Sequence, residues 1–334
     1  MREASRFEFA ASPLYRMLAA AACEDERLLA LAAKARPRQH PPFMLFAAVH
    51  DLVLRGVPCE ELAAFYASAG GTAAPSGSSI AAFRGFALAH EEEITRLIAS
   101  RSVSKTDLRR GACLRALLIE AAHRLGADAV HLVDVGCSAG LNLLLDRWRI
   151  AYGGAGEAGP EASRVRIATE VRGKAPPLQT LPAILSRTGI DLARIDPGDP
   201  EDERWILAHL FPEETALIAA TREAFAELRR SPPDLREGDA IALLPEVVDR
   251  LQRDAPVVVM HSLTLAGFGL EQSRALAATL KRISAERRTA RIYMEKTENG
   301  AVLGVAVPAW QRGTRAGSAD LDGRWMSWEL PAPA

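Results

Sequence analysis

A turn flanked by glycines and preceded by an acid is the segment of this sequence best suited to chemistry. It spans Val133–Asn142 and reads VDVGCSAGLN. The apolar periodicity that begins at Leu141 predicts a helix directly after the turn. Backbone N–H groups in such a turn approach a ligand closely at the positive end of a helix, so we expect a binding site here. Its expected members are Asp134, Gly136, Cys137, Ser138, Gly140 and Asn142.

Several kinds of site share this layout. A dinucleotide fingerprint requires Gly-x-Gly-x-x-Gly, but Ser138 stands at the middle glycine and Leu141 stands just after Gly140. A phosphate-binding Walker loop requires a following Gly-Lys-Ser/Thr, which is missing. The spacing Gly-x-Ser-x-Gly also fits a hydrolase nucleophile elbow with Ser138 as nucleophile, for which His261 is the only well-placed histidine. A tight strand-to-helix turn without a ligand is a further interpretation.

The turn resembles motif I of the class I S-adenosylmethionine-dependent methyltransferases, whose usual form is acid-x-Gly-x-Gly-x-Gly. Asp134, Gly136 and Gly140 match this form, whereas Ser138 replaces the middle glycine. The resemblance implies S-adenosylmethionine as the cofactor. The serine adds a Cβ atom and a hydroxyl where that cofactor approaches the turn.

Two later acids match further parts of the same core. RTGIDLARIDP (187–197) resembles its second strand, whose terminal acid binds the ribose hydroxyls. This role falls to Asp191, with Glu170 as an alternative nearer to the usual spacing, because a carboxylate accepts two hydrogen bonds from a diol. LREGDAIALLP (235–245) resembles the loop after the third strand and assigns Asp239 to the adenine amino group. Both aspartates are also consistent with ordinary turn acids.

The candidate catalytic residues follow a third apolar run. PVVVMHSLTL (256–265) resembles the fourth strand of the core, whose carboxyl end faces the methyl group, and places His261 and Ser262 there. A histidine titrates near working pH and can act as a general base for an oxygen or nitrogen nucleophile. A hydrogen-bonded structural histidine is the alternative.

The elements that must position these residues change in character at residue 129. The chain up to 128 predicts helices only, including 13 to about 34, 42–55, 80–100 and 108–126. After it, short apolar runs at 129–135, 256–260 and 291–295 alternate with helical patterns, which predicts a parallel sheet with crossover helices. Turn signals before 301–307 and 324–330 predict that the last strands are antiparallel.

These patterns predict an α/β protein with two domains. Residues 1–128 form an all-helical N-terminal domain on the substrate side. Residues 129–334 are expected to form a mostly parallel sheet with antiparallel C-terminal strands, which the resemblance to class I methyltransferases implies is Rossmann-like. A protruding hairpin is expected at about 148–172. The aromatic residues of the helical domain either line an acceptor pocket or pack in its core; they are Phe43, Phe46, Phe65, Tyr66, Phe83 and Phe86.

Over nearly its whole length the chain resembles an uncharacterised bacterial family, domain of unknown function 2332, in which a helical part precedes a methyltransferase-like core. The resemblance lies in segments 40–56, 133–147, 189–208 and 323–330. It implies the fold and no substrate. This chain departs from the family pattern at 104–107 and at Asp322, where the family tends to carry Gln-Thr-Asn-Glu and His.

Composition excludes several partners. The formal net charge of -1 in 334 residues gives no bulk attraction to nucleic acid or anionic lipid. Four separated cysteines and seven unpaired histidines predict no metal site. No apolar run is long enough to cross a membrane, and 17–23 fits a helix better than a signal sequence, so the expected location is the cytoplasm.

Together these observations predict S-adenosylmethionine-dependent methyl transfer to a small or medium acceptor. Such chemistry needs mainly alignment and a dry pocket, so few dedicated groups are required. A non-catalytic protein that binds S-adenosylmethionine or a nucleotide on the same fold is the alternative, supported by Ser138 and the departures from the family pattern. A nicotinamide enzyme is disfavoured by the turn. The oligomeric state is left open.

Overall fold

A computed structural model describes residues 8–37, 39–193 and 195–331 of the chain. Its contacts divide the chain into two compact units, one of residues 1–106 with 198–219 and one of residues 107–197 with 220–334. This division differs from the expected boundary at 128, because the helix before the first strand belongs with the sheet. Residues 198–219 return to the helical unit. No helix in the described part of the chain has the length and apolar character needed to span a membrane.

The first unit is helical, as the sequence predicts. The expected helix from 13 to about 34 is two helices, because Asp25 accepts hydrogen bonds from the N–H groups of Arg27 and Leu28 and starts a new one. The expected helix 80–100 is likewise interrupted at His90. The helical segments of this unit are α1 (Pro13–Ala22), α2 (Glu26–Ala32), α3 (Pro41–Leu54), α4 (Glu60–Ala63), η2 (Ala67–Ala69), α5 (Gly77–Ala89), α6 (Glu91–Ser100) and α8 (Pro200–Ala208).

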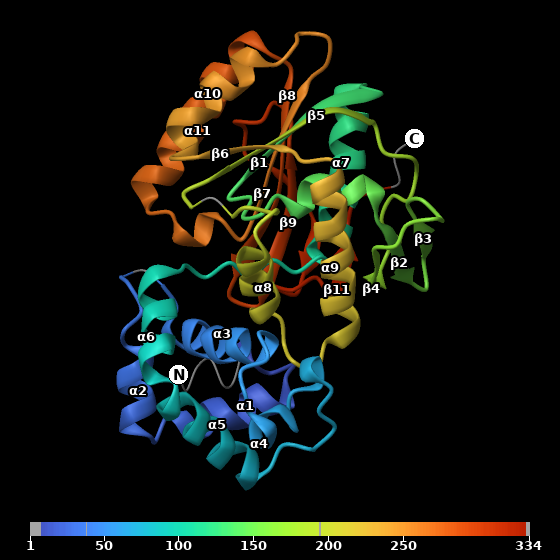
Figure 1. The fold of residues 1–334 in the computed structure, drawn as a ribbon. Helices are drawn as coiled ribbons and strands as arrows, with labels where there is room; N and C mark the ends of the chain where they lie inside the picture. Colours follow the sequence, from blue (N-terminus) through green and yellow to red (C-terminus); the bar gives the residue numbers. More distant parts are fainter. Residues whose placement is uncertain (1–7, 38, 194, 332–334) are drawn as a thin grey trace. The chain divides into compact units, whose positions relative to one another are not determined.

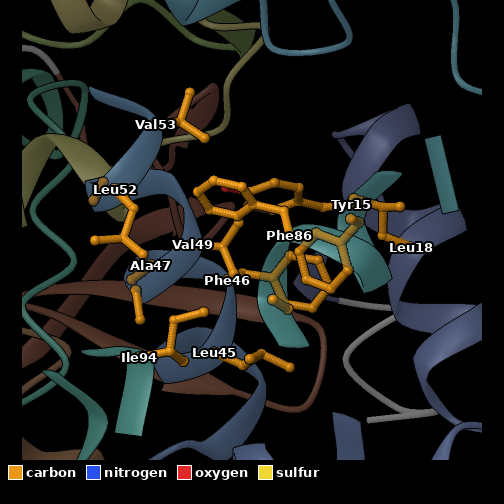
Figure 2. Close-up of a cluster of buried hydrophobic side chains, with 14 of the residues drawn as sticks. Tyr15, Leu18, Leu45, Phe46, Ala47, Val49, Leu52, Val53, Phe86 and Ile94 are labelled. Atoms are coloured by element: carbon orange, nitrogen blue, oxygen red, sulfur yellow. The ribbon is translucent and has the colours of Figure 1, made fainter. Parts of the chain in front are cut away.

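The apolar core of this unit is built around α3. Phe46 and Phe83 stack with ring centroids 5.2 Å apart, and Tyr15 packs against Phe46 from α1. Figure 2 shows Tyr15, Phe46 and Phe86 together within this cluster. Of the six aromatic residues expected to line a pocket or pack in the core, four are buried in it and Phe43 and Phe65 pack against it. They are therefore core residues.

The second unit contains one mixed sheet of eleven strands (Figure 1), in the order β3-β2-β4-β11-β10-β9-β8-β7-β1-β5-β6. The strands are β1 (Ala129–Val135), β2 (Arg149–Gly153), β3 (Gly156–Ala158), β4 (Arg166–Gly173), β5 (Ala183–Asp191), β6 (Asp234–Glu237), β7 (Val257–Ser262), β8 (Thr289–Thr297), β9 (Gly300–Ala306), β10 (Thr314–Ala319) and β11 (Trp325–Trp328). The predicted α/β class is confirmed.

Five neighbouring strands, β6, β5, β1, β7 and β8, are all parallel. The chain fills this block outward from β1, first toward β6 and then toward β8. The strand order therefore reverses beside β1, and in open α/β sheets ligands bind at the carboxyl ends of strands at such a point. Next to β8, strands β9, β10 and β11 are antiparallel, as the turn signals predict.

The predicted protruding hairpin at 148–172 is wrong in its pairing. Strands β2 and β4 do form there, but they are parallel to each other, and only the short β3 makes a hairpin with β2. β4 also pairs in parallel with β11 near the end of the chain. The insertion therefore extends the sheet, and the partner that decides this lies about 150 residues away in the sequence.

Helices cover both faces of the parallel block. Figure 1 shows α10 (Ala240–Arg250) and α11 (Leu270–Glu286) on one side and α7 (Arg110–Leu125) on the other. The apolar side chains of α10 and α11 share a buried cluster with Val133, Val135 and Val259. α7 packs on β7, β8 and β9. α9 (Thr215–Arg230) begins in the first unit and continues in the second.

Candidate functional site

The glycine turn, residues 136–140, leaves the carboxyl end of β1 as predicted. Gly136, Ser138 and Gly140 have φ angles of 75°, 52° and 80°, so three of its five residues are left-handed. The helix expected after it is only a seven-residue 3-10 segment, η3 (Leu141–Arg147), broken at Leu144. The turn therefore lacks the long helix at whose positive end the sequence predicted a binding site.

Side chains of the protein itself fill the space beside both glycines. A Cβ atom at Gly136 would collide with the side chain of Thr264, which follows β7, and one at Gly140 would press on Leu235 and Pro233. Thr264 is fixed there because its hydroxyl donates to the carbonyl of Val135 at 3.0 Å. The two glycines thus serve close packing within the chain, which is the role that the ligand-free interpretation of the turn predicts.

Two of the predicted acids meet at this edge of the sheet. Asp134 is 3% exposed, and its Oδ2 atom has no hydrogen-bond partner among the described residues. Burial, followed by the nearby charge of Asp191, raises the pKa of Asp134 well above its usual value. Burial and the same two acids also raise the pKa of the Cys137 thiol. Asp134, Asp191 and Cys137 therefore form one cluster, in which the cysteine is held in its protonated form.

Asp191 ends β5, which pairs directly with β1. One of its oxygens accepts a hydrogen bond from the backbone N–H of Ser138 at 2.7 Å, and the other accepts a longer one, 3.3 Å, from Ala193. The acid thus holds the glycine turn. The alternative ribose acid, Glu170, lies on β4, with β11, β10, β9, β8 and β7 between it and β1, and is exposed and paired with Arg172. Of these two acids, Asp191 is the one that contacts the glycine turn.

Asp239 is exposed and caps the N-terminus of α10. Its side chain accepts a hydrogen bond from the N–H of Ile241 at 2.9 Å. This is the ordinary turn-acid role that the sequence left open. The preceding Gly238 donates its N–H to the carbonyl of Asp191 at 2.8 Å, so Asp239, which follows β6, lies beside the end of β5 that carries that acid.

His261 has a carboxylate partner that the sequence did not reveal. Its Nδ1 lies 2.6 Å from an oxygen of Glu295, near the end of the neighbouring strand β8. Glu295 in turn accepts the backbone N–H groups of Thr264 and Leu265, both at 3.1 Å. The ring of Tyr293 stacks on that of His261 at 5.6 Å and 7°. The signal was present, since Glu295 ends the run 291–295 at the carboxyl edge of a parallel strand.

This contact fixes the hydrogens on the imidazole. Glu295 is oriented by two N–H donors and accepts the proton of Nδ1, so the neutral ring carries its lone pair on Nε2. His261 is 1% exposed, and Nε2 has no hydrogen-bond partner among the described residues. A buried lone pair without a donor is unfavourable in the protein alone and is suited to an O–H or N–H group of a ligand.

Unpartnered buried polar atoms gather at this edge. Besides Asp134 and His261, the described structure leaves Oγ of Ser138, Oδ1 of Asn142 and Oγ of Ser262 without hydrogen-bond partners. Because neither Ser138 nor His261 has a partner at these atoms, they are not bonded to each other, and the hydrolase arrangement is not formed. No group of three or more potential metal-ligating side chains occurs among the described residues.

The whole sequence was compared with protein families and with curated proteins. Residues 1–328 match the model of a family described as an uncharacterised protein conserved in bacteria (DUF2332). The chain belongs to this family. No curated protein matches this DUF2332 protein.

Two acids at positions that the sequence analysis singled out, Asp322 and Asp107, have arginine partners in the structure. Asp322 is buried and lies 2.8 Å from Nη1 of Arg324. Asp107 accepts hydrogen bonds from the backbone and side chain of Arg109 before α7 begins. Both acids are therefore held by arginines within the second unit.

Proposed function

We propose that this protein binds S-adenosylmethionine at the carboxyl ends of β1, β5 and β7 and transfers its methyl group to a small or medium acceptor. The observation that carries the proposal is the buried carboxyl of Asp134. It has one unpartnered oxygen and lies beside Asp191 at the point where the strand order reverses. A buried acid with an unsatisfied oxygen is costly, and such groups concentrate in functional sites.

The strand order of the sheet is consistent with this proposal. The parallel order β6-β5-β1-β7-β8 has β1 in its middle and is followed by the antiparallel β9. An acid lies at the carboxyl end of β1 and another at that of β5, namely Asp134 and Asp191. This is the arrangement that the resemblance to class I methyltransferases implies. The order alone is shared by unrelated binding folds, so the side chains must carry the choice.

The side chains fit the cofactor in part. Carboxylates at Asp134 and Asp191 suit the ammonium and hydroxyl groups that S-adenosylmethionine carries, and Asn142 offers a further unpartnered oxygen. Thr264 occupies the space at Gly136, so close approach to that glycine is excluded unless Thr264 moves. We therefore assign binding to the acids and Asn142, and assign to Gly136 only the shaping of the turn.

The chemistry also needs a group that removes a proton from the acceptor. When bound, S-adenosylmethionine supplies an electrophilic methyl group. Nε2 of His261 takes the O–H or N–H proton of the acceptor, and Glu295 stabilises the imidazolium through its contact at Nδ1. Tyr293 stacks on the ring and limits its rotation. Ser262, the next residue, is available to hold the acceptor through its unpartnered hydroxyl.

Calorimetry with S-adenosylmethionine tests the binding step. We expect micromolar affinity for the wild type and at least about tenfold weaker binding for Asp191→Asn, because the charge-assisted hydrogen bonds are lost. Asp234→Asn is the matched control, since Asp234 is an exposed acid on the neighbouring β6 that pairs with Arg236. The absence of binding heat at millimolar ligand, with unchanged melting, contradicts the proposal.

The Thr264 side chain fills the space beside Gly136. This observation favours the alternative function, in which the protein binds the ligand without catalysing its reaction. Incubation with methyl-labelled S-adenosylmethionine and a pool of bacterial small molecules separates the two. Labelled product that is reduced at least about tenfold in His261→Gln, with cofactor affinity unchanged, supports methyl transfer. Cofactor binding with no labelled product supports the non-catalytic alternative.

A further inference from the structure

Arg115, in the middle of α7, is a buried cation without a counter-ion. The residue is 3% exposed and forms no ion pair with any described residue. Its one hydrogen bond runs from Nη2 to the carbonyl of Gln179 at 2.9 Å, while Nε and Nη1 have no partner. Burial accordingly lowers the pKa of its guanidinium. Arginines that are fully buried are normally paired, so this one requires an explanation.

The polar groups around Arg115 carry no negative charge. Tyr152 on β2 is its nearest polar neighbour, and burial raises the pKa of that phenol while the charge of Arg115 lowers it. The Tyr152 hydroxyl donates to the carbonyl of Ala112 at 2.9 Å, and its oxygen can still accept a hydrogen bond from Arg115. A neutral phenol held in this way cannot neutralise a guanidinium.

Two further donors without partners lie on the same surface of the unit. Thr169 is paired with Tyr152 in the register of β2 and β4, is 3% exposed, and has an unpartnered Oγ1. Trp148 is fully buried against Gly111, and its indole N–H is also unpartnered. Gly111 and Arg115 are four residues apart on α7 and so share one helix face. The side chains of Thr169 and Trp148 therefore both lie toward the face of α7 that carries Arg115.

The geometry of the guanidinium specifies the missing group. Nη2 has two hydrogens and donates one to the carbonyl of Gln179. Its second hydrogen is still available and forms a pair of parallel N–H donors with either Nε or Nη1. Such an edge matches the two oxygens of a carboxylate or phosphate group. We propose that Arg115, assisted by Thr169 and Trp148, binds a small oxyanion of this kind.

The position is compatible with entry from solvent. Gln179, whose carbonyl holds the arginine, is itself exposed, so the guanidinium lies directly beneath the loop between β4 and β5. The proposed site uses none of the residues assigned to S-adenosylmethionine. Its failure would leave the proposed function intact, and the reverse is also true.

Melting and calorimetry with simple anions test the site. Inorganic phosphate and acetate are compared with chloride at equal ionic strength and neutral pH. We expect one of the two oxyanions to raise the Tm of the wild type by about 5 °C near saturation, through preferential binding to the folded state. The anion that gives the larger shift identifies the group as phosphate or carboxylate.

Variants locate the effect. Arg115→Met should abolish the oxyanion-dependent shift, and Thr169→Val should weaken the affinity severalfold without removing a charge. Arg166→Met, which removes an exposed arginine of β4, is the charge-matched control and should respond as the wild type does. An equal response of Arg115→Met and the wild type overturns the proposal, as does a wild type that does not distinguish either oxyanion from chloride. If Arg115→Met does not fold, an unchanged affinity in Thr169→Val overturns the assigned donor set.

Discussion

Glu295 orients His261 from the neighbouring strand, with 2.6 Å between its carboxylate and Nδ1. The two residues are 34 positions apart in the sequence, yet the parallel register of β7 and β8 brings them together at the same edge. The carboxylate is itself fixed by two backbone N–H groups. A histidine held in one tautomer, with the other nitrogen buried and unpartnered, is organised to accept a proton from a ligand.

Replacement of Glu295 by glutamine should disturb both the tautomer and the fold. The amide nitrogen of glutamine would face an N–H donor, so we expect the free energy of unfolding to fall by about 2–4 kcal/mol in denaturant titrations. Nitrogen NMR of His261 should show Nε2 unprotonated in the wild type and a mixture of tautomers in the variant. Glu329→Gln, which removes an exposed pair with Arg315, should cost no more than about 1 kcal/mol. Equal costs would contradict the positioning role of Glu295.

Gly136 and Gly126 allow conformational strain to be separated from collision. Both have positive φ angles, 75° and 57°, but a Cβ atom meets Thr264 at Gly136 and nothing within 4 Å at Gly126. We expect Gly126→Ala to lower the free energy of unfolding by about 1 kcal/mol, and Gly136→Ala to lower it by about 3 kcal/mol or more, in denaturant titrations. In a Thr264→Ala background the cost at Gly136 should fall by at least about 1 kcal/mol. No such coupling would mean that Thr264 does not fill the space.

Asp134 should make the protein less stable as the pH rises. Its pKa is raised in the folded state by burial and by Asp191, so the folded protein holds the proton more tightly than the unfolded chain. Stability from this group is complete below the unfolded pKa of about 4 and is lost toward the raised folded value, by up to about 1.4 kcal/mol per pH unit. Asp134→Asn should therefore gain stability relative to the wild type between pH 5 and 8. A constant difference over that range, as expected for the control Asp234→Asn, contradicts the prediction.

Two buried histidines predict acid sensitivity of the first unit. Burial lowers the pKa of both His50 and His209 to about 4, below the unfolded value of about 6.5. The unfolded chain therefore takes up protons first as the pH falls from about 6.5 toward 4, and stability is lost by up to about 1.4 kcal/mol per pH unit for each histidine. Unfolding at pH 7 and pH 5 should show a smaller loss in His50→Gln, whereas exposed His123→Gln should behave as the wild type.

The sequence predicts the parts of the fold that are determined locally. The runs 129–135 and 256–260 are rich in valine and other apolar residues, as buried parallel strands are, and become β1 and β7. The helix expected at 42–55 begins at two prolines and ends before Gly56, and becomes α3. The acids at the carboxyl ends of β1 and β5 could also be found, because parallel strands bring such ends together.

The missed features depend on partners far away in the chain. β2 and β4 look like a hairpin because they are close in sequence, but β11 pairs with β4 and keeps it parallel to β2. The periodic segment from Leu141 looks helical over its whole length, yet only a 3-10 segment forms before β2 begins. Thr264 enters the candidate site from the segment after β7, and no local pattern predicts its contact with Gly136.

The first unit takes part of its core from α8 and the residues that follow it, because Trp205, Ala208 and Phe211 lie in the same cluster as α3. A ribosome completes residues 1–106 and then makes strands β1 to β5 of the sheet before it supplies these side chains. During translation, residues 1–106 of the first unit therefore leave part of their apolar surface exposed until residues 198–219 are synthesised. A gene shortened to end at 197 would encode a helical half that cannot close, and we expect such a nascent product to depend on chaperones or to aggregate.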